Sequence, residues 1–123
     1  MWCWIIENNG KKTLVGSIYR SPNSTESNNK LLLEEIVRAN DIAGDNRLLI
    51  LGDLNVPYIN WDNKELTEKA RLIELYALDV INDCFLFQHV NKPTRFRNNE
   101  SSLLDLILTK EEEDVRNIEV FHP

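Results

Sequence analysis

The sequence has few cysteines and little positive charge for its length of 123 residues. Cys3 and Cys84 stand alone, without the spacing of metal ligands, which favours a reduced intracellular setting, in the cytoplasm or the nucleus. Lys and Arg together number 14 against 20 Asp and Glu, and the net charge of −6 argues against a free-standing nucleic-acid binder, whose surface is usually basic. No apolar run approaches the length that crosses a bilayer, which argues against a membrane protein, and Trp2–Ile6 lacks the basic leader of a signal peptide.

The length and composition are those of one soluble globular domain over residues 1–123. Hydrophobic residues make up 42% of the chain and charged residues 28%, which excludes a disordered or membranous class. There is no internal repeat and no low-complexity segment. The acidic run 111–114 is interpreted as a solvated turn.

One stretch stands out as a candidate site. Leu48–Leu51 is a short apolar run, typical of a strand buried on both faces. Gly52 breaks the run, and Asp53 and Asn55 follow two residues apart, so that an extended backbone would point both side chains to the same side. Ligands of open α/β sheets bind beyond the carboxyl ends of strands. On these residues alone, however, an ordinary strand-to-loop turn is favoured, because Asp and Asn are common there.

The remaining pattern predicts a layered α/β or α+β domain. Asn8-Asn9-Gly10 between two apolar segments indicates a hairpin of residues 1–6 and 12–19. Apolar residues at helical spacing predict helices over about 29–40 and 64–78, the second capped by Asp62 or Asn63. The other expected elements are a short strand around 86–89, a loop or hairpin turn over 92–101, a buried strand over 103–109 and a last strand over 115–120.

Asp105 lies among five aliphatic residues within 103–108. An unpaired buried carboxylate is costly, so the sequence predicts a partner for it: a cation, a histidine, a metal or backbone donors. The alternative is an aspartate at a strand end that caps a loop. The functional interpretation is favoured, because the apolar run shows no strand end at residue 105.

Four motifs occur in order along the chain. They are Tyr-Arg-Ser-Pro-Asn at 19–23, Gly-Asp-Leu-Asn at 52–55, Pro-Thr-Arg at 93–95 and Ser-Ser-Leu-Leu-Asp-Leu-Ile-Leu-Thr at 101–109. Together they resemble the endonuclease/exonuclease/phosphatase superfamily and, within it, the endonuclease domains of non-LTR retrotransposons. The last two motifs are the ones most particular to the retrotransposon branch.

The resemblance implies a fold and a chemistry. The fold is a four-layered α/β sandwich, two packed mixed sheets with outer helices, of which residues 1–123 form a part. The activity is hydrolysis of phosphodiesters in DNA with Mg²⁺ or Mn²⁺. Asp53 is similar to the aspartate that orients or deprotonates the attacking water, Asn55 to the amide that steadies the scissile phosphate, and Asp105 to the carboxylate that pairs with a catalytic histidine. An anionic substrate attacked by water needs such donors and such a base.

Three further residues are expected to bind substrate. Tyr19 and Asn23 resemble the family residues that contact the phosphate. Arg95 forms a basic cluster with Lys92 and Arg97, which fits a hairpin that contacts phosphates. Three exposed charges in a loop are equally well explained by solvation.

The resemblance also implies segments that this sequence does not contain. Family members carry an asparagine and a metal-binding glutamate in earlier strands and a Ser-Asp-His segment after the last one. No residue here is therefore assigned as a metal ligand, and the main ligands are expected outside the chain. His122 does not follow Ser-Asp and is not assigned a catalytic role, and His89 is expected to be structural.

The leading hypothesis is therefore a fragment of an element-encoded endonuclease, weak or inactive by itself. In a longer polyprotein its partners would be DNA and a downstream reverse transcriptase. A second hypothesis is a non-catalytic remnant that binds DNA or, given its acidic charge, more plausibly a protein. A phosphatase of the same fold is disfavoured by the motifs at 93–95 and 101–109.

Overall fold

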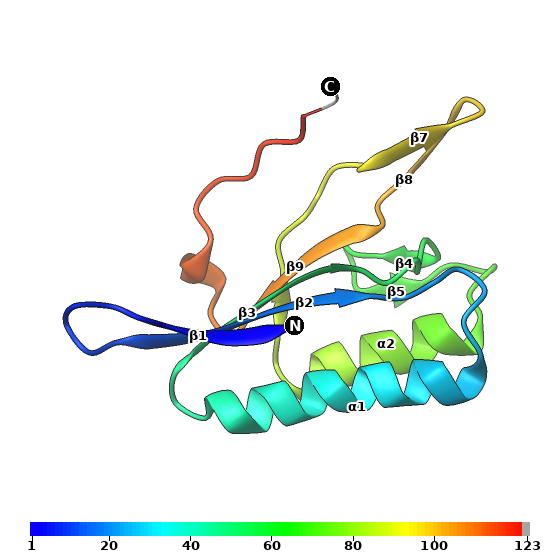
Figure 1. The fold of residues 1–123 in the computed structure, drawn as a ribbon. Coiled ribbons are helices and arrows are strands. Elements are labelled where there is room, and N and C mark those ends of the chain that lie inside the picture. Colours follow the sequence, from blue (N-terminus) through cyan, green and yellow to red (C-terminus); the bar gives the residue numbers. More distant parts are fainter. Residues whose placement is uncertain (122–123) are drawn as a thin grey trace.

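The computed structural model describes residues 1–121, in which two helices cover one face of a five-stranded sheet (Figure 1). The strand order is β1-β2-β3-β9-β6. The strands of this sheet are β1 (Trp2–Ile6), β2 (Lys12–Tyr19), β3 (Arg47–Asp53), β6 (Phe87–Gln88) and β9 (Asp105–Thr109). The helices are α1 (Glu26–Ala43) and α2 (Leu72–Asp83), with a short 3-10 turn, η1 (Glu112–Asp114). Two small hairpins pair β4 (Ile59–Asn60) with β5 (Glu65–Leu66), and β7 (Arg95–Arg97) with β8 (Glu100–Ser102).

The large sheet is mixed. β2 and β3 are parallel and are joined by α1, whereas β1–β2, β3–β9 and β6–β9 are antiparallel pairs. The predicted first hairpin is confirmed, and its turn includes Gly10 at φ 85°, a conformation that glycine adopts without strain. A parallel pair needs a crossover connection, and α1 provides it.

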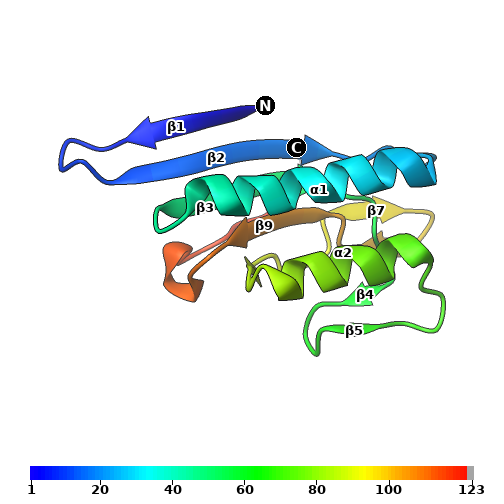
Figure 2. The same cartoon turned by 90° about the horizontal axis from the view of Figure 1, so that it is seen from below.

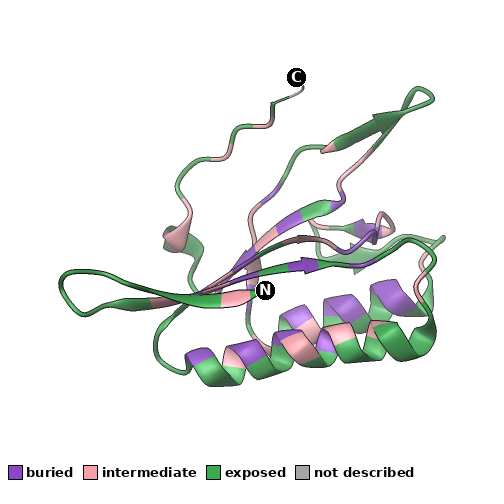
Figure 3. Cartoon of the chain, in the orientation of Figure 1, coloured by how far each residue is buried: buried purple, intermediate pink, exposed green. Residues whose placement is uncertain are grey.

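The core lies between the sheet and the helices (Figures 2 and 3). Alternate residues of the strands, including Leu48, Ile50 and Leu108, point toward the helices and are almost completely buried. Ile36 of α1 and Ala77 of α2 meet them with no exposed surface. This alternation follows from strand geometry, in which successive side chains point to opposite faces.

The opposite face of the sheet is open, which corrects the expectation that Leu48–Leu51 is buried on both faces. Leu51 is 39% exposed, and Leu49 and Ile107 on the same face are only partly buried. The uninterrupted apolar run predicted two covered faces, but residues 1–121 cover only one with helices.

The second helix begins later than the sequence predicts. Residues 59–66 form the β4–β5 hairpin, and α2 begins only at Leu72. Its start is fixed by a capping box, in which the Glu74 carboxylate accepts the backbone N–H of Arg71 at 2.9 Å. Asp62 and Asn63 therefore cap no helix.

Other boundaries differ less. The first helix is longer than expected, because the Thr25 hydroxyl caps its first turn and it continues to the residue before Gly44. The expected hairpin within 92–101 is present as β7–β8. The expected last strand is wrong, because no strand occurs over 115–120. The question of His122 lies outside the described residues.

The mixed α/β class is confirmed. Within residues 1–121, however, there is one large sheet rather than two packed against each other. None of the helices in this part of the chain is long and apolar enough to cross a membrane.

Gly52 is required by the close approach of β2 and β3. A Cβ at this position would fall well inside contact distance of the Ile18 carbonyl oxygen. We expect Gly52→Ala to lower the free energy of unfolding by about 1–3 kcal/mol, because backbone has to move. Chemical denaturation measures this, with Ser17→Ala on the open face as a control that changes it by less than about 0.5 kcal/mol. Equal stability of the two variants would contradict the packing argument.

Candidate functional site

Three of the six predicted site residues lie in one row across the sheet. Tyr19, the last residue of β2, is the Cα partner of Asp53 in β3, and Asp53 is the Cα partner of Asp105 in β9. Their neighbours Ile18 and Leu106 are buried toward the helices, so all three side chains lie on the open face. Strand register thus brings together residues 86 positions apart in the chain.

Asp53 has both carboxylate oxygens engaged. Its Oδ1 accepts the backbone N–H of Asn55 at 2.8 Å, and its Oδ2 lies 3.2 Å from Nη2 of Arg95. The Asp53 side chain is 13% exposed, whereas that of Arg95 is 50% exposed. A carboxylate held by a backbone donor and an arginine has a defined orientation and can serve as a hydrogen-bond acceptor or as a base.

Asn55 follows β3 in a left-handed backbone conformation, with φ 50°. It is 7% exposed, and its side-chain Nδ2 donates to the Arg20 carbonyl oxygen at 2.6 Å. Asparagine tolerates this backbone region better than most residues. The turn therefore fixes the amide next to the Asp53 carboxylate.

Asp105 is exposed, which corrects the expectation of a buried carboxylate in need of a partner. β9 begins at Asp105, so the strand end that the apolar pattern did not reveal lies at this residue. Its backbone N–H donates to the Thr94 hydroxyl at 3.2 Å, and its carboxylate has no hydrogen-bond or ion-pair partner within residues 1–121. Because Asp105 is exposed, water solvates its carboxylate and no protein partner is needed.

The other two expected substrate residues are placed differently. Arg95 begins the β7–β8 hairpin, which projects from the open side of the sheet (Figure 1) and turns through Asn98 and Asn99 at positive φ. Asn23 is exposed in the loop between β2 and α1, and its one hydrogen bond to the described part of the chain runs from its backbone N–H to the Ser21 hydroxyl at 3.4 Å.

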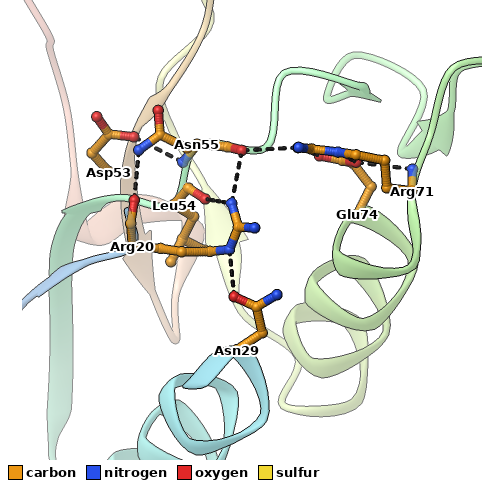
Figure 4. A network of polar contacts seen from close by, with 7 residues as sticks. All are labelled: Arg20, Asn29, Asp53, Leu54, Asn55, Arg71 and Glu74. Carbon is orange, nitrogen blue, oxygen red and sulfur yellow. Dashed lines mark hydrogen bonds and ion pairs between the residues drawn. The ribbon is translucent and has the colours of Figure 1, made fainter. Parts of the chain in front are cut away.

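A network of hydrogen bonds next to the row joins the segments that follow β2 and β3 to α1 and to the start of α2 (Figure 4). Arg20, 4% exposed, donates through Nε to Asn29 of α1 and through Nη1 to the carbonyl oxygens of Leu54 and Asn55. From the start of α2, Arg71 reaches the same Asn55 carbonyl at 3.1 Å.

The two positive charges of this network are partly offset by one buried carboxylate, that of Glu74. Burial, followed by the charge of Arg71, lowers the pKa of Arg20, and the Glu74 carboxylate partly offsets this. Hydrogen bonding to Glu74 raises the pKa of Arg71. Both guanidinium groups remain charged, since their ordinary pKa lies far above neutrality. No motif pointed to Arg71 or Glu74; the signal available in the sequence was the spacing of a capping box.

His89 lies away from the row. Its Nε2 is 2.7 Å from the Thr109 hydroxyl, at the opposite end of β9 from Asp105. The Thr109 hydroxyl itself donates to the Glu111 carbonyl oxygen, so the imidazole Nε2–H donates to Thr109. His89 therefore does not reach the Asp105 carboxylate.

No group of three or more His, Cys, Asp or Glu side chains gathers in a metal-binding arrangement within residues 1–121. Asp53 and Asp105 offer oxygen donors of the kind that Mg²⁺ prefers, but both Asp53 oxygens have other partners. The described residues alone do not make up a complete metal site.

The family model described as endonuclease-reverse transcriptase matches residues 13–123, most of the chain. Among solved structures, the chain is similar to the "Endonuclease domain of TRAS1, a telomere-specific non-LTR retrotransposon", with a TM-score of 0.59 and 18% sequence identity. The match covers 83% of this chain and 45% of that one, so the chain spans less than half the length of that domain. At this identity the likeness shows the fold alone. No curated protein matches the chain.

The left-handed backbone of Asn55 leads to a stability prediction. We expect Asn55→Ala to lower the free energy of unfolding by about 1–3 kcal/mol, because alanine is strained at positive φ and lacks the bond to Arg20. Asn55→Gly removes the same side chain without the strain and should recover about 1 kcal/mol of that loss. Chemical denaturation of both variants tests this. An alanine variant as stable as the glycine variant would show that the conformation is not strained.

His89 leads to a pH prediction. Burial lowers the pKa of His89 below its ordinary value of 6.5, although the carboxylates of Asp114 and Glu112 act in the opposite direction. Below about pH 6.5 the unfolded chain takes up a proton that the folded protein resists, so the free energy of unfolding should fall as the pH drops. Above that pH the contribution is constant. Denaturation between about pH 5.5 and 7.5 should show a shallower slope for His89→Gln; an unchanged slope would rule out His89 as its source.

Proposed function

Because the chain belongs to the endonuclease-reverse transcriptase family, we propose that it forms part of an endonuclease site that hydrolyses phosphodiester bonds in DNA. The observation that supports this best is the row of Tyr19, Asp53 and Asp105 on one face of the sheet, with Asn55 directly after it. Residues 1–123 would then be part of one endonuclease domain.

In this proposal Asp53 acts on the attacking water. Water adds to phosphorus while Asp53 takes its proton, the bond from phosphorus to the leaving oxygen breaks, and that oxygen takes a proton from solvent. Asp105 would pair with a histidine supplied from outside the described residues, as the family resemblance implies. Its exposed carboxylate, without a partner in residues 1–121, is compatible with this role.

Asn55, Tyr19 and Asn23 are proposed to hold the phosphate. The Asn55 amide is fixed by its bond to the Arg20 carbonyl, and a preorganised donor stabilises developing charge without reorganisation. Tyr19 is 66% exposed beside Asp53 and can reach a bound phosphate. Asn23 would have to approach from its loop.

Arg95 is proposed to bind a phosphate of the DNA backbone. In the free protein its guanidinium pairs with Asp53 Oδ2 at 3.2 Å, and a phosphate would compete for that guanidinium. The exchange would release one oxygen of Asp53 for the attacking water. The hairpin would then couple DNA binding to the availability of the base.

Magnesium is the ion that the family resemblance implies, with manganese as a substitute. The residues of this chain do not form a complete ligand set, so no step of the proposal is assigned to a metal held by them. The main ligands would come from the rest of the domain.

The open face of the sheet is proposed to pack against a second sheet, giving the four-layered sandwich. Leu49, Leu51 and Ile107 present apolar surface there, and burying it would be favourable. The partial coverage of the similar solved domain is consistent with further layers. In a longer polyprotein, a reverse transcriptase would be the neighbouring domain.

A non-catalytic binding module is the alternative. The same open apolar face and the net charge of −6 would then favour a protein partner over DNA. The two functions are distinguished by whether a DNA duplex shifts the NMR signals of Tyr19, Asp53 and Asp105.

The proposal is tested by titrating the ¹⁵N-labelled chain with a short DNA duplex. We expect salt-dependent binding that shifts the signals of Tyr19, Asp53, Asp105 and the hairpin. Arg95→Gln should weaken binding about tenfold, as expected for loss of a charge-assisted bond. Arg47→Gln is the matched control, since its side chain is also 50% exposed and ion-paired but lies at the other end of β3.

Plasmid nicking with Mg²⁺ tests the catalytic part. The chain alone is expected to nick slowly or not at all, and any nicking should be lost in Asp53→Ala. Rapid turnover that Asp53→Ala abolishes would support the base but overturn the view that this chain is weak by itself. Absence of duplex-induced shifts in the row, or shifts confined to the helices, would overturn the endonuclease proposal.

A further inference from the structure

The carbonyl oxygen of Asn55 accepts hydrogen bonds from two arginines that come from different elements, Arg20 after β2 and Arg71 at the start of α2 (Figure 4). Arg20 Nη1 lies at 3.3 Å and Arg71 Nη2 at 3.1 Å. Arg20 follows β2 directly and belongs to the Tyr-Arg-Ser-Pro-Asn motif, whereas Arg71 lies 16 residues after Asn55 and belongs to no motif. Two guanidinium groups converging on one carbonyl repel each other, so an arrangement of this kind requires a compensating anion.

Glu74 supplies that anion and holds Arg71 in place. Its Oε1 accepts from Arg71 Nε at 2.8 Å and its Oε2 from Nη2 at 2.6 Å, a two-pronged pair, and the carboxylate is completely buried. On the other side, the Arg71 guanidinium lies 5.4 Å from the centre of the Tyr58 ring. Arg71 is thus oriented by α2 and by the loop that follows Asn55.

The orientation of the Asn55 carbonyl is coupled to the site. The backbone N–H of the same residue bonds Asp53 Oδ1, and its side chain bonds the Arg20 carbonyl. Because φ of Asn55 is 50°, relaxation toward a common backbone conformation would swing all three groups together. A restraint on the carbonyl is therefore also a restraint on the amide and on the carboxylate beside it.

We propose that Arg71, held by Glu74, is a positioning residue for Asn55 that acts through the Asn55 carbonyl without touching the phosphate. The site role of Asn55 rests on the proposed function, whereas the mechanical role of Arg71 does not. If Arg71 and Glu74 served stability alone, replacing them with an equally stable pair of residues would leave Asn55 in its place.

A double substitution separates the two roles. Arg71→Met alone leaves the Glu74 charge buried without a partner and should destabilise the fold strongly. Replacing both, as Arg71→Met with Glu74→Met, removes the stranded charge and should restore part of the stability, although the backbone N–H of residue 71 still lacks its Glu74 acceptor. The Asn55 carbonyl still lacks its Arg71 donor in the double variant, so positioning should not recover with stability.

The readout is the side-chain amide of Asn55, followed by NMR without DNA or metal. Its signal is identified as the one missing in Asn55→Gly. We expect its hydrogens to exchange with water about tenfold faster in the double variant, a ratio typical of losing one hydrogen bond. Arg38→Met, an arginine exposed on α1, is the matched control and should leave the rate unchanged.

Arg71→Lys is the second variant, in case the double variant does not fold. Lysine keeps the charge beside Glu74 but lacks the planar fork that reaches two acceptors at once. It should keep most of the stability and still raise the exchange rate. A folded double or lysine variant with the wild-type exchange rate would overturn the proposal.

The failure of this inference is distinguishable from that of the proposed function. If the wild-type chain neither binds nor nicks DNA, the exchange measurement still decides whether Arg71 positions Asn55. If nicking is measurable, Arg71→Lys should lower kcat about tenfold with little change in KM, because the lost bond acts on orientation rather than on substrate binding. A change in KM alone would assign Arg71 a substrate-binding role instead and overturn the positioning role.

Discussion

The lateral register of three strands determines where every candidate group lies. β3 pairs in parallel with β2 on one side and antiparallel with β9 on the other, and these two registers place Tyr19, Asp53 and Asp105 at the same level. A slip of one residue in either pair would turn a side chain toward the helices. The buried residues Ile50 and Leu108 oppose such a slip, because it would expose them. The core thus fixes the site from the opposite face of the sheet.

How much was predictable from the sequence depends on the range of the interaction. The Asn-Gly turn and the apolar stripe of α1 are local signals, and both elements were found. The motifs identified Asp53 and Asn55 but contained no information on register, which arises from pairing between distant strands. The start of α2 was missed because the β4–β5 hairpin interrupts a segment whose residues favour a helix. Local preference was overridden there by the buried Arg71–Glu74 cap.

Asp105 and Leu51 show that burial, too, is only partly predictable from the sequence. Both lie in apolar runs, from which full burial was expected, and both are exposed on the open face. An apolar run indicates that both faces of a strand are suited to burial, but it does not show that residues 1–121 contain the elements that bury them. At Asp105 this exposure means that solvent, rather than a protein partner, solvates the carboxylate.

The contact between Arg95 and Asp53 joins the β7–β8 hairpin to the row of Tyr19, Asp53 and Asp105. Their oxygen and nitrogen atoms are 3.2 Å apart, and Asp53 is mostly shielded while Arg95 is half exposed. An exposed arginine side chain can be redirected at little cost in free energy, whereas the Asp53 carboxylate also accepts the Asn55 backbone N–H at 2.8 Å. A competing anion would therefore move the arginine and leave the carboxylate in place. The Asp53 carboxylate is thus held by the turn after β3, which the Arg20–Arg71 network also contacts, whereas its other partner, Arg95, comes from an exposed hairpin.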